Sequence, residues 1–361
     1  MPYLLAFLGF AALIILHEAG HFTAAKAVGM RVERFSLFFG PMLVKFRRGE
    51  TEYGIGPIPL GGYVKITGMN PNEEIPEEAR PRAYYNQPVW KRVVVISAGP
   101  AVNILIAFAI IWALLMSDGL PNTVSKTVQT VERSTPAASV LRPGDQLVSV
   151  DGLRGSVAAL RSRIDSHRCA GALVQGCVAK VPVRIVVRRD GRLVQFDVRP
   201  RYVAFDQGVK VQRMELGFVF APVYPSAPTA ASQSVSDLWT TSVRTVSTIV
   251  RVFEPKERKQ LHGVVGGYET TEQSFSHSTT LALEVLALIS LSLGVINLFP
   301  FLPLDGGHIF WALAEKVRGR RIPFAVMERA GMVGFVLIIM LFFIGLSNDI
   351  STLSSGGFGV R

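Results

Sequence analysis

A His-Glu-x-x-His motif, His17-Glu18-Ala19-Gly20-His21, ends a run of apolar residues near the start of the chain. Residues i and i+4 of a helix lie on one face, so His17 and His21 can present two imidazoles to one metal ion. Glu18 lies beside them, where it can act as general base on a metal-bound water. A chance match at a helix end is the alternative. The stretch 2–16 has no charged residue, and ionisable groups in an apolar span indicate function, so we favour the metal.

A catalytic zinc site needs a third protein ligand besides two histidines. The candidate is Asp305, in the segment NLFPFLPLDGGH (Asn297–His308), where prolines and glycines interrupt an apolar stretch. Such breaks are tolerated at membrane depth where the backbone faces protein or a water-filled cavity. The alternative role for Asp305 is the N-cap of a helix that starts near His308. A cap does not explain a helix break inside a span that also carries Asn297, so we expect Asp305 to bind the metal.

Four apolar stretches are long enough to be membrane helices, which need about 20 residues for a hydrocarbon layer of roughly 30 Å. They cover residues about 3–28, 93–116, 281–302 and 331–346. Hydrophobic residues make up 49% of the chain, too many for an ordinary soluble globule. The first stretch has neither a basic region before it nor a small-residue cleavage site after it. We therefore expect it to be retained and not removed as a signal peptide.

Lysine and arginine gather in two of the connections between these stretches. The first connection carries Arg31, Arg34, Lys45, Arg47, Arg48, Lys65, Arg80, Arg82, Lys91 and Arg92, and the last carries Lys316, Arg318, Arg320, Arg321 and Arg329. The positive-inside rule predicts that both connections face the cytoplasm and that both termini lie outside it. Much of the net charge of +11 then reflects topology, so nucleic-acid binding is a poor explanation for it.

This orientation exports the segment that starts at residue 117, whose centre is β-rich. Two β-branched runs, 181–187 and 193–198, meet around Asp190-Gly191, a strong hairpin signal. Upstream, STPAASVLRPGDQLVSVDG (134–152) resembles the bacterial PDZ signature, and another small β-domain is the alternative. We therefore predict one PDZ-like domain at about 127–201, which would bind peptide ends by strand addition. The predicted organisation is membrane core 1–116, exported region 117–235, amphipathic membrane-surface segment 236–280 and membrane core 281–361.

Cys169 and Cys177 are the two cysteines of the chain, and both fall in the exported region. An oxidising compartment permits a disulfide between them, and two buried free thiols are an equally common arrangement. The sequence leaves both possibilities open. His167, His262 and His277 have no histidine partner at i+4, so we expect surface or capping roles for them.

The motifs together resemble one family. HExxH in the first apolar stretch with NxxPxxxLDG at the end of the third is the signature of the site-2 protease family of intramembrane zinc metalloproteases. Four spans with a periplasmic PDZ insert resemble the bacterial branch of that family, over nearly the whole chain. The resemblance implies that His17, His21 and Asp305 bind Zn²⁺. It also implies that Glu18 activates water and that Asn297 contacts the substrate.

Two further segments match the family. YGIGPIPLGGYVKI (Tyr53–Ile66) resembles its membrane-re-entrant β-loop, with Gly61, Gly62 and Tyr63 as substrate-binding residues in a membrane-associated β-hairpin. An edge strand there could pair with an unwound substrate, and a plain cytoplasmic hairpin is the alternative. The segment Leu261–Gly267 resembles a family motif before the third span, but histidine and valine replace its serine and proline.

The family resemblance implies a zinc endopeptidase of the bacterial cytoplasmic membrane that cuts single-span membrane proteins within the bilayer. We expect its substrates to be anti-sigma-factor-like or signal-peptide-like proteins that are cleaved in regulated intramembrane proteolysis. A membrane-tethered PDZ adaptor without activity and a zinc transporter are the alternatives. The intact HExxH and LDG argue against the adaptor, and the lack of an internal repeat argues against the transporter. We expect the PDZ-like domain to contact substrate ends or to exclude bulky ectodomains.

Overall fold

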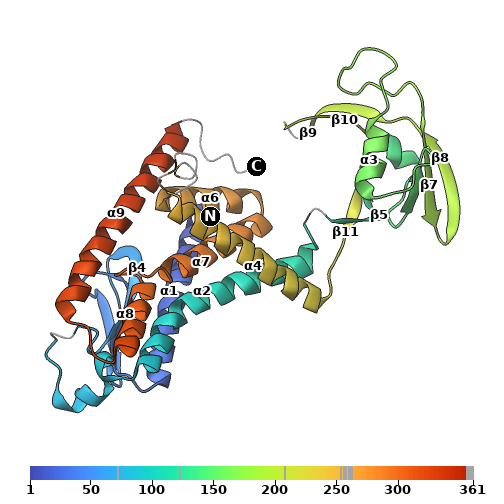
Figure 1. The fold of residues 1–361 in the computed structure, drawn as a ribbon. Coiled ribbons are helices and arrows are strands. Elements are labelled where there is room, and N and C mark those ends of the chain that lie inside the picture. The colour runs from blue at the N-terminus through green and yellow to red at the C-terminus, as the bar shows by residue number, and fades with distance from the viewer. Residues whose placement is uncertain are drawn as a thin grey trace. The chain divides into compact units, whose positions relative to one another are not determined.

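The computed structural model describes residues 1–70, 73–121, 123–206, 209–252, 254, 258 and 263–354. The chain divides into two compact units (Figure 1). The first unit combines Met1–Leu114 with Ala231–Arg361, and the second is Leu115–Ala230. The first unit is mainly helical and the second mainly β-structure, as the sequence predicts for a membrane core interrupted by a β-rich insert.

Four helices are long and apolar enough to cross a membrane, which confirms the predicted number of spans for the described residues. They are α1 (Pro2–Ala27), α2 (Val89–Asp118), α7 (Thr279–Asn297) and α9 (Phe324–Ser354). Helix α9 extends beyond the predicted 331–346 at both ends, because a helix continues until its backbone is interrupted, not until its hydrophobicity stops. Helix α7 ends at Asn297, short of the predicted 302, because Pro300 and Pro303 disfavour helix in the following turn.

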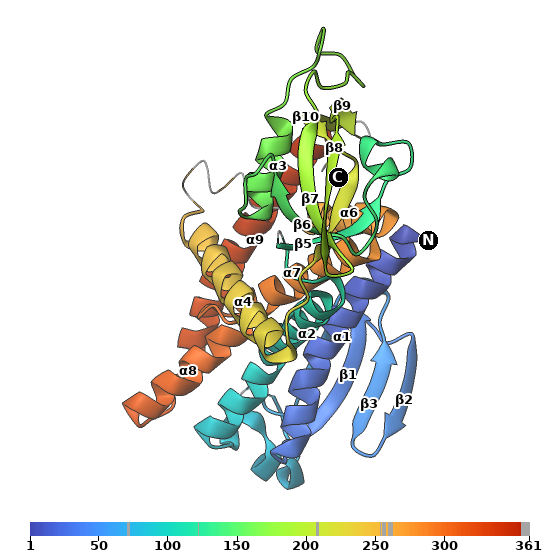
Figure 2. The same ribbon diagram turned by 90° about the vertical axis from the view of Figure 1, so that its right-hand side faces the viewer.

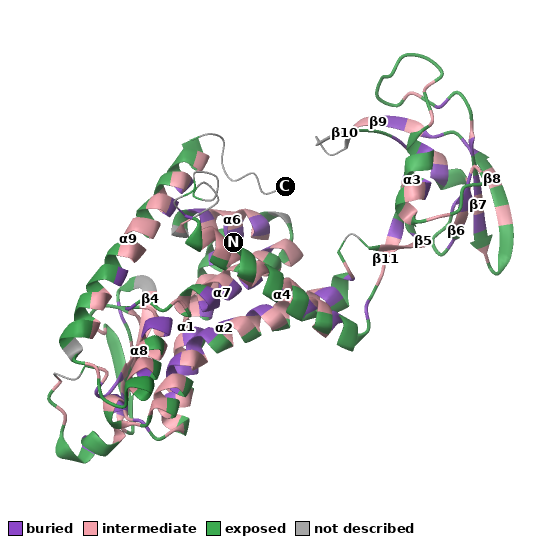
Figure 3. Cartoon of the chain, viewed as in Figure 1, coloured by how far each residue is buried: buried purple, intermediate pink, exposed green. Residues whose placement is uncertain are grey.

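The surface of α9 supports its assignment as a span. Several large apolar side chains along it are more than half exposed in the protein alone, and the burial colouring shows exposed residues along most of its length (Figure 3). Met332, Val333 and Val336 are examples, with 59%, 63% and 65% of their surface exposed. Exposed apolar area on this scale is unfavourable in water and is compatible with lipid.

A four-stranded sheet follows α1 in the first unit. Its strands are β1 (Val32–Phe39), β2 (Val44–Arg48), β3 (Thr51–Ile55) and β4 (Ile58–Ile66), in the order β2-β3-β1-β4. Figure 2 shows β2, β3 and β1 beside α1, and both β1 and β4 contact that helix. Strand β1 is parallel to β3 and antiparallel to β4.

This strand order corrects the β-hairpin predicted for Tyr53–Ile66. Strands β3 and β4 do not pair with each other, because β1 lies between them. The connection crosses the end of β1, where the Gly56 N–H donates to the Leu37 carbonyl at 2.7 Å. A Cβ at Gly56 would lie 2.4 Å from the Phe39 carbonyl oxygen, so glycine permits this crossing. Pairing with β1 is a long-range choice that the local pattern of Tyr53–Ile66 does not encode.

The second unit is built on a five-stranded sheet with the order β11-β5-β6-β7-β8. Its strands are β5 (Val124–Val131), β6 (Gln146–Val150), β7 (Val183–Arg189), β8 (Arg192–Val198) and β11 (Phe218–Pro222). Helix α3 (Val157–Asp165) packs on it through Leu160 and Ile164, which join the buried core with Leu147 and Ile185. A two-stranded ribbon of β9 (Arg201–Asp206) and β10 (Val209–Glu215) lies outside this sheet.

The predicted hairpin at Asp190-Gly191 is confirmed. Strands β7 and β8 pair in register up to Arg189 and Arg192, and both turn residues have positive φ (50° and 78°), as a type I′ turn requires. The sheet that contains this hairpin extends beyond 127–201, the limits predicted for the PDZ-like domain. The sheet begins at Val124, and β11 pairs with β5, which brings together the two ends of the unit. A local sequence pattern does not indicate that β5 and β11, which lie far apart in the chain, pair with each other.

The remaining helices belong to the segments that flank α7. They are α4 (Ala227–Val250), which begins before the predicted 236, α6 (Val264–His277) and α8 (Asp305–Arg318). Short 3₁₀ turns η1 (Glu77–Arg82) and η2 (Tyr84–Asn86) precede α2, and η3 (Pro136–Ser139) follows β5. Helix α6 packs against α1 and α7.

Candidate metal centre

Helix α1 brings His17 and His21 onto one face, and both residues are buried, each 6% exposed. Their Nε2 atoms lie 3.2 Å apart, which is the consequence of the i,i+4 spacing. The helix passes close to α2 at this level, because a Cβ at Gly20 would lie 2.7 Å from the Ala98 carbonyl oxygen. A small residue inside the motif therefore lets the two helices approach each other.

Asp305 is the first residue of α8 and turns its carboxylate toward the two histidines. Its Oδ2 lies 3.2 Å from His17 Nε2 and 3.3 Å from His21 Nε2. The N-cap position belongs to Leu304, and no side chain caps the helix there, so the alternative role of Asp305 as a cap is not observed. The glycines after Asp305 pack against the backbone of the preceding turn. A Cβ at Gly306 would lie 2.2 Å from the Leu298 carbonyl oxygen.

The spacing of the three ligand atoms fits zinc. A tetrahedral Zn²⁺ with bonds of about 2.0–2.1 Å places its ligand atoms about 3.3 Å apart. The three observed separations are 3.2, 3.2 and 3.3 Å. Two imidazoles and one carboxylate are the donor set of a catalytic zinc site with an open fourth position. His17, His21 and Asp305 therefore form a group that could hold one ion.

Helix α2 supplies the surroundings of the two histidines, a role that the motif search missed. The Nδ1 of His21 lies 2.8 Å from the Val95 carbonyl oxygen, so Nδ1 carries the proton and leaves the Nε2 lone pair for a metal. A Cβ at Gly99 would lie 2.3 Å from His21 Nε2 and 2.9 Å from His17 Nε2, so only glycine fits there. The sequence signal was Gly99-Pro100 inside an uncharged span, because small residues mark close helix packing in membranes.

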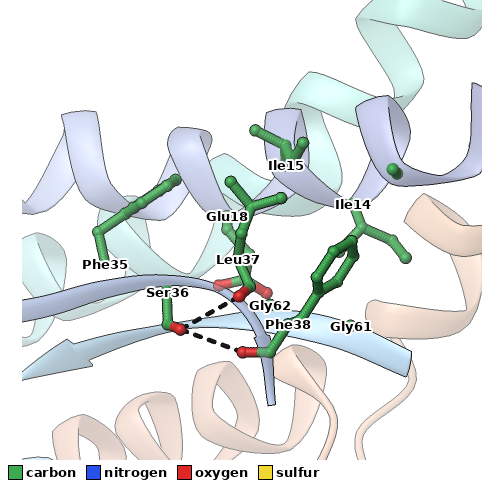
Figure 4. Close-up of a pocket in the computed structure, with 10 residues that line it drawn as sticks. Ile14, Ile15, Glu18, Phe35, Ser36, Leu37, Phe38, Gly61 and Gly62 are labelled. Carbon is green, nitrogen blue, oxygen red and sulfur yellow. Dashed lines mark hydrogen bonds between the residues drawn. The ribbon is translucent and has the colours of Figure 1, made fainter. Parts of the chain in front are cut away.

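Glu18 lines a pocket between α1 and strands β1 and β4 (Figure 4). Isoleucines of α1 and residues of β1 provide its apolar walls, and Ser36, Gly61 and Gly62 line the side next to the sheet. A Cβ at Gly62 would lie 3.2 Å from Glu18 Cγ, so glycine leaves this carboxylate its space.

The comparisons with known proteins decide the family. The model of Peptidase family M50 matches residues 5–341, which is most of the chain. The chain belongs to this family. The resemblance to site-2 proteases is thereby confirmed, and the protein is a peptidase by family.

Curated relatives agree with this assignment. Zinc metalloprotease Rip1 of Mycobacterium tuberculosis is 33% identical to this chain, and the match covers 84% of this chain and 83% of Rip1. Rip1 of Mycolicibacterium smegmatis is 32% identical, with 90% and 88% covered. Among solved structures, the PDZ domain of the SdrC-like protein from Listeria monocytogenes matches 28% of this chain and 92% of that domain. That similarity has 20% identity and a TM-score of 0.20, too low to bear on the fold of the second unit.

The predicted substrate-binding residues do not all lie at the cluster. Gly61 and Gly62 line the pocket beside Glu18. The Tyr63 ring stacks on Phe39, with 6.1 Å between the ring centroids. Asn297 is the last residue of α7 and is partly exposed, and no described hydrogen bond joins it to the cluster. Its predicted contact with substrate stays a prediction.

The structure joins Cys169 and Cys177 in a disulfide, with 5.8 Å between their Cα atoms. The bridge closes a short loop after α3, and this loop packs with Tyr202 of β9 and Met214 of β10. His167 has a structural role, because its Nε2 lies 2.9 Å from the Asp151 carboxylate. His262 lies outside the described residues.

Proposed function

We propose that this protein is a zinc-dependent intramembrane endopeptidase that cleaves single-span membrane proteins in the bacterial cytoplasmic membrane. The observation that carries the proposal is the tetrahedral spacing of His17, His21 and Asp305, with the first two inside an apolar helix. The family and the named zinc metalloproteases among its relatives support proteolysis. His17 and His21 lie on a helix that is long and apolar enough to cross a membrane, which supports cleavage within the membrane.

The chain's own residues suggest how the reaction runs. His17, His21 and Asp305 would hold the ion, and Val95 would keep His21 in the tautomer that binds it. Zinc at this site supplies Lewis-acid polarisation of the scissile carbonyl and lowers the pKa of a bound water to about 7. Glu18 would take the proton of the attacking water and give it to the leaving amine. Gly62 leaves this carboxylate its space beside β4.

Strand β4 is the element that we propose to align the substrate. It is an edge strand, because its neighbour in the sheet is β1 alone. Gly61 and Gly62 of β4 line the pocket that contains Glu18, so this strand lies beside the proposed base. An extended substrate paired with this edge would expose its peptide bonds. In a helix, by contrast, each carbonyl accepts a hydrogen bond from the N–H four residues later and is therefore occupied.

We further propose that both basic connections face the cytoplasm. Contacts within the first unit support a shared side for them. Arg321, between α8 and α9, donates to Asn86 at 3.1 Å, and Lys91 donates to the carbonyl of Val28 after α1. The ends of three apolar helices and the connection after α8 therefore meet at one end of the unit. The positive-inside rule then assigns that end to the cytoplasm and both termini to the other side.

The second unit would act on substrates outside the cytoplasm. We propose that it is PDZ-like and that it contacts substrate ends or excludes bulky ectodomains. Its support is the GD-containing signature that leads into β6 and the hairpin β7–β8, together with helix α3 packed on the sheet. Anti-sigma-factor-like or signal-peptide-like proteins remain the proposed substrates.

One experiment separates this proposal from an inactive adaptor. The full chain and its Glu18→Gln variant are purified in detergent, metal content is measured, and both are incubated with a single-span substrate. We expect zinc in both proteins and cleavage by the wild type alone, at bonds that mass spectrometry places inside the span. Removal of zinc by a chelator and its return should abolish and restore the cut. Cleavage only outside the span, or turnover by Glu18→Gln, would contradict the proposal.

A further inference from the structure

A nearly buried ion pair joins the helix that holds His21 in position to the helix that carries Asp305. Arg92, near the start of α2, lies with Nη2 2.5 Å from Glu315 Oε2, near the end of α8. The two side chains are only 11% and 12% exposed. Exposed ion pairs contribute little to protein stability. The desolvation cost of a buried pair is offset only where its geometry is good and further hydrogen bonds support it.

The surroundings support the Glu315 carboxylate, whereas the buried Arg92 Nε has no hydrogen-bond partner among the described residues. The second oxygen of Glu315, Oε1, accepts the backbone N–H of Ile322 at 3.3 Å, so the carboxylate also holds the connection between α8 and α9. The Arg92 guanidinium lies 5.9 Å from the centre of the Tyr84 ring, and Tyr84 in turn donates its N–H to the Thr67 carbonyl. The pair thus links α2, α8 and the segment after the sheet.

Helix α2 therefore contacts His21 directly and the helix that carries Asp305 through the ion pair. Val95, one turn after Arg92, accepts the hydrogen bond from His21. Through Arg92 the same stretch of α2 holds Glu315, which lies on α8 about 15 Å along the axis from Asp305 at a rise of 1.5 Å per residue. The start of α8 is held by the tight turn at Gly306 and Gly307, and Glu315 holds its other end.

We propose that Arg92 and Glu315 are positioning residues for the metal centre. Their ion pair sets the direction of α8 relative to α2, and through it the approach of the Asp305 carboxylate to His17 and His21. This inference rests on the proposed zinc site. Its physical basis is that a ligand held by a single helix end completes a tetrahedral site only if that helix has one orientation. Loss of a group that hydrogen-bonds directly to a metal ligand typically lowers metal affinity 10- to 100-fold, and this pair acts through helix α8, at the lower end of that range.

The test measures zinc affinity of the purified full chain by competition with a chromophoric chelator, independently of cleavage. We expect Arg92→Gln and Glu315→Gln to weaken zinc binding about tenfold or more. Arg92→Lys retains the charge and should recover most of the affinity. Glu315→Asp retains the charge with a shorter reach, so its affinity should lie between those of wild type and Glu315→Gln and its fold should persist.

Arg82→Gln is the matched control. It removes an arginine of the same unit from its bidentate pair with Glu50, and it leaves α8 untouched. The unfolding temperature of each metal-free variant is measured alongside. Zinc affinities of Arg92→Gln and Glu315→Gln equal to wild type would overturn the inference, and so would an equal loss in Arg82→Gln. Failure of the wild type to bind zinc would instead overturn the proposed function.

Discussion

At the scale of single residues, the metal centre separates ligands from the proposed base by the direction of their side chains. His17, His21 and Asp305 converge on one point, whereas Glu18 enters the pocket next to the sheet. Adjacent residues on a helix point about 100° apart, so His17 and Glu18 serve different tasks from neighbouring positions. Substitutions of the two acidic residues should therefore have different consequences.

Asp305→Ala should lower zinc content as well as cleavage, unlike Glu18→Gln. The variant removes one of three ligand atoms that lie at tetrahedral spacing, and two histidines rarely hold a catalytic zinc alone. Metal analysis after dialysis against a weak chelator, with Glu18→Gln in parallel, provides the measurement. Full zinc content in Asp305→Ala would remove Asp305 from the ligand set.

Gly62→Ala should slow cleavage roughly tenfold, or about 1.4 kcal/mol of barrier, while zinc stays bound. The new Cβ would lie 2.9 Å from the Ser36 carbonyl oxygen and 3.2 Å from Glu18 Cγ. Both contacts are tighter than van der Waals distance, so the strand or the carboxylate must shift. Gly171→Ala is the control, because nothing lies within 4 Å of its Cβ position. Equal activity of the two variants would show that the space beside Glu18 is not needed.

At the scale of elements, ion pairs join segments that the chain separates widely. In the second unit, Arg189 at the end of β7 donates two hydrogen bonds to the Asp145 carboxylate, and Asp145 is buried before β6. Burial alone would raise the pKa of Asp145. The hydrogen bonds from Arg189 and from the Arg142 backbone N–H outweigh it and hold the pKa below its usual value.

Stability of the second unit should therefore depend on pH through Asp145. Because the folded pKa is lower than the unfolded value of about 3.9, this stabilisation is complete above that pH. It is lost as the pH falls through the folded pKa. Asp145→Asn should cost about 2 kcal/mol at pH 6 and weaken the pH dependence below pH 4. Hydrogen exchange of residues 124–222 in the full chain checks this. A variant with wild-type protection at pH 6 would show that the pair contributes nothing.

At the scale of the whole molecule, the two units suggest a division of labour between chemistry and substrate selection. Deletion of residues 124–222, which removes the complete sheet and not only 127–201, should keep cleavage of a short substrate. It should also relax the exclusion of a substrate with a bulky ectodomain. The measurements are the cleavage rates of both substrates, with zinc content as the control for folding. Loss of activity on the short substrate in a zinc-loaded variant would mean that this unit helps to build the active site.

The disulfide connects the fold to the proposed compartment. Cys169 and Cys177 should resist alkylation in protein isolated from membranes and react after reduction, because an oxidising compartment retains the bridge. Cys169→Ser with Cys177→Ser should lower stability by about 2–3 kcal/mol for so short a loop. Intact mass before and after reductant measures the bridge. Two thiols that are freely alkylated without reductant would exclude it.

The sequence by itself was sufficient to identify the candidate metal ligands and the candidate spans. HExxH and LDG name the ligand types, and uninterrupted apolar stretches require membrane-length helices, because both signals are local. The Asp190-Gly191 turn could also be predicted from a local signal, because two neighbouring residues with positive φ suffice to specify it. The ends of α7 and α9 could not be predicted from the apolar stretches alone, because helix ends depend on turns and contacts beyond them.

Tertiary structure alone decided which of the open alternatives apply. The direction of the Asp305 carboxylate, toward the histidines and not toward the helix N-terminus, depends on the turn that packs against Gly306. The separation of β3 from β4 depends on pairing with β1. The contributions of Val95, Gly99 and Arg92 depend on where α2 lies beside α1 and α8. Each is an interaction between segments far apart in the chain, whose energy no local pattern of residue types contains.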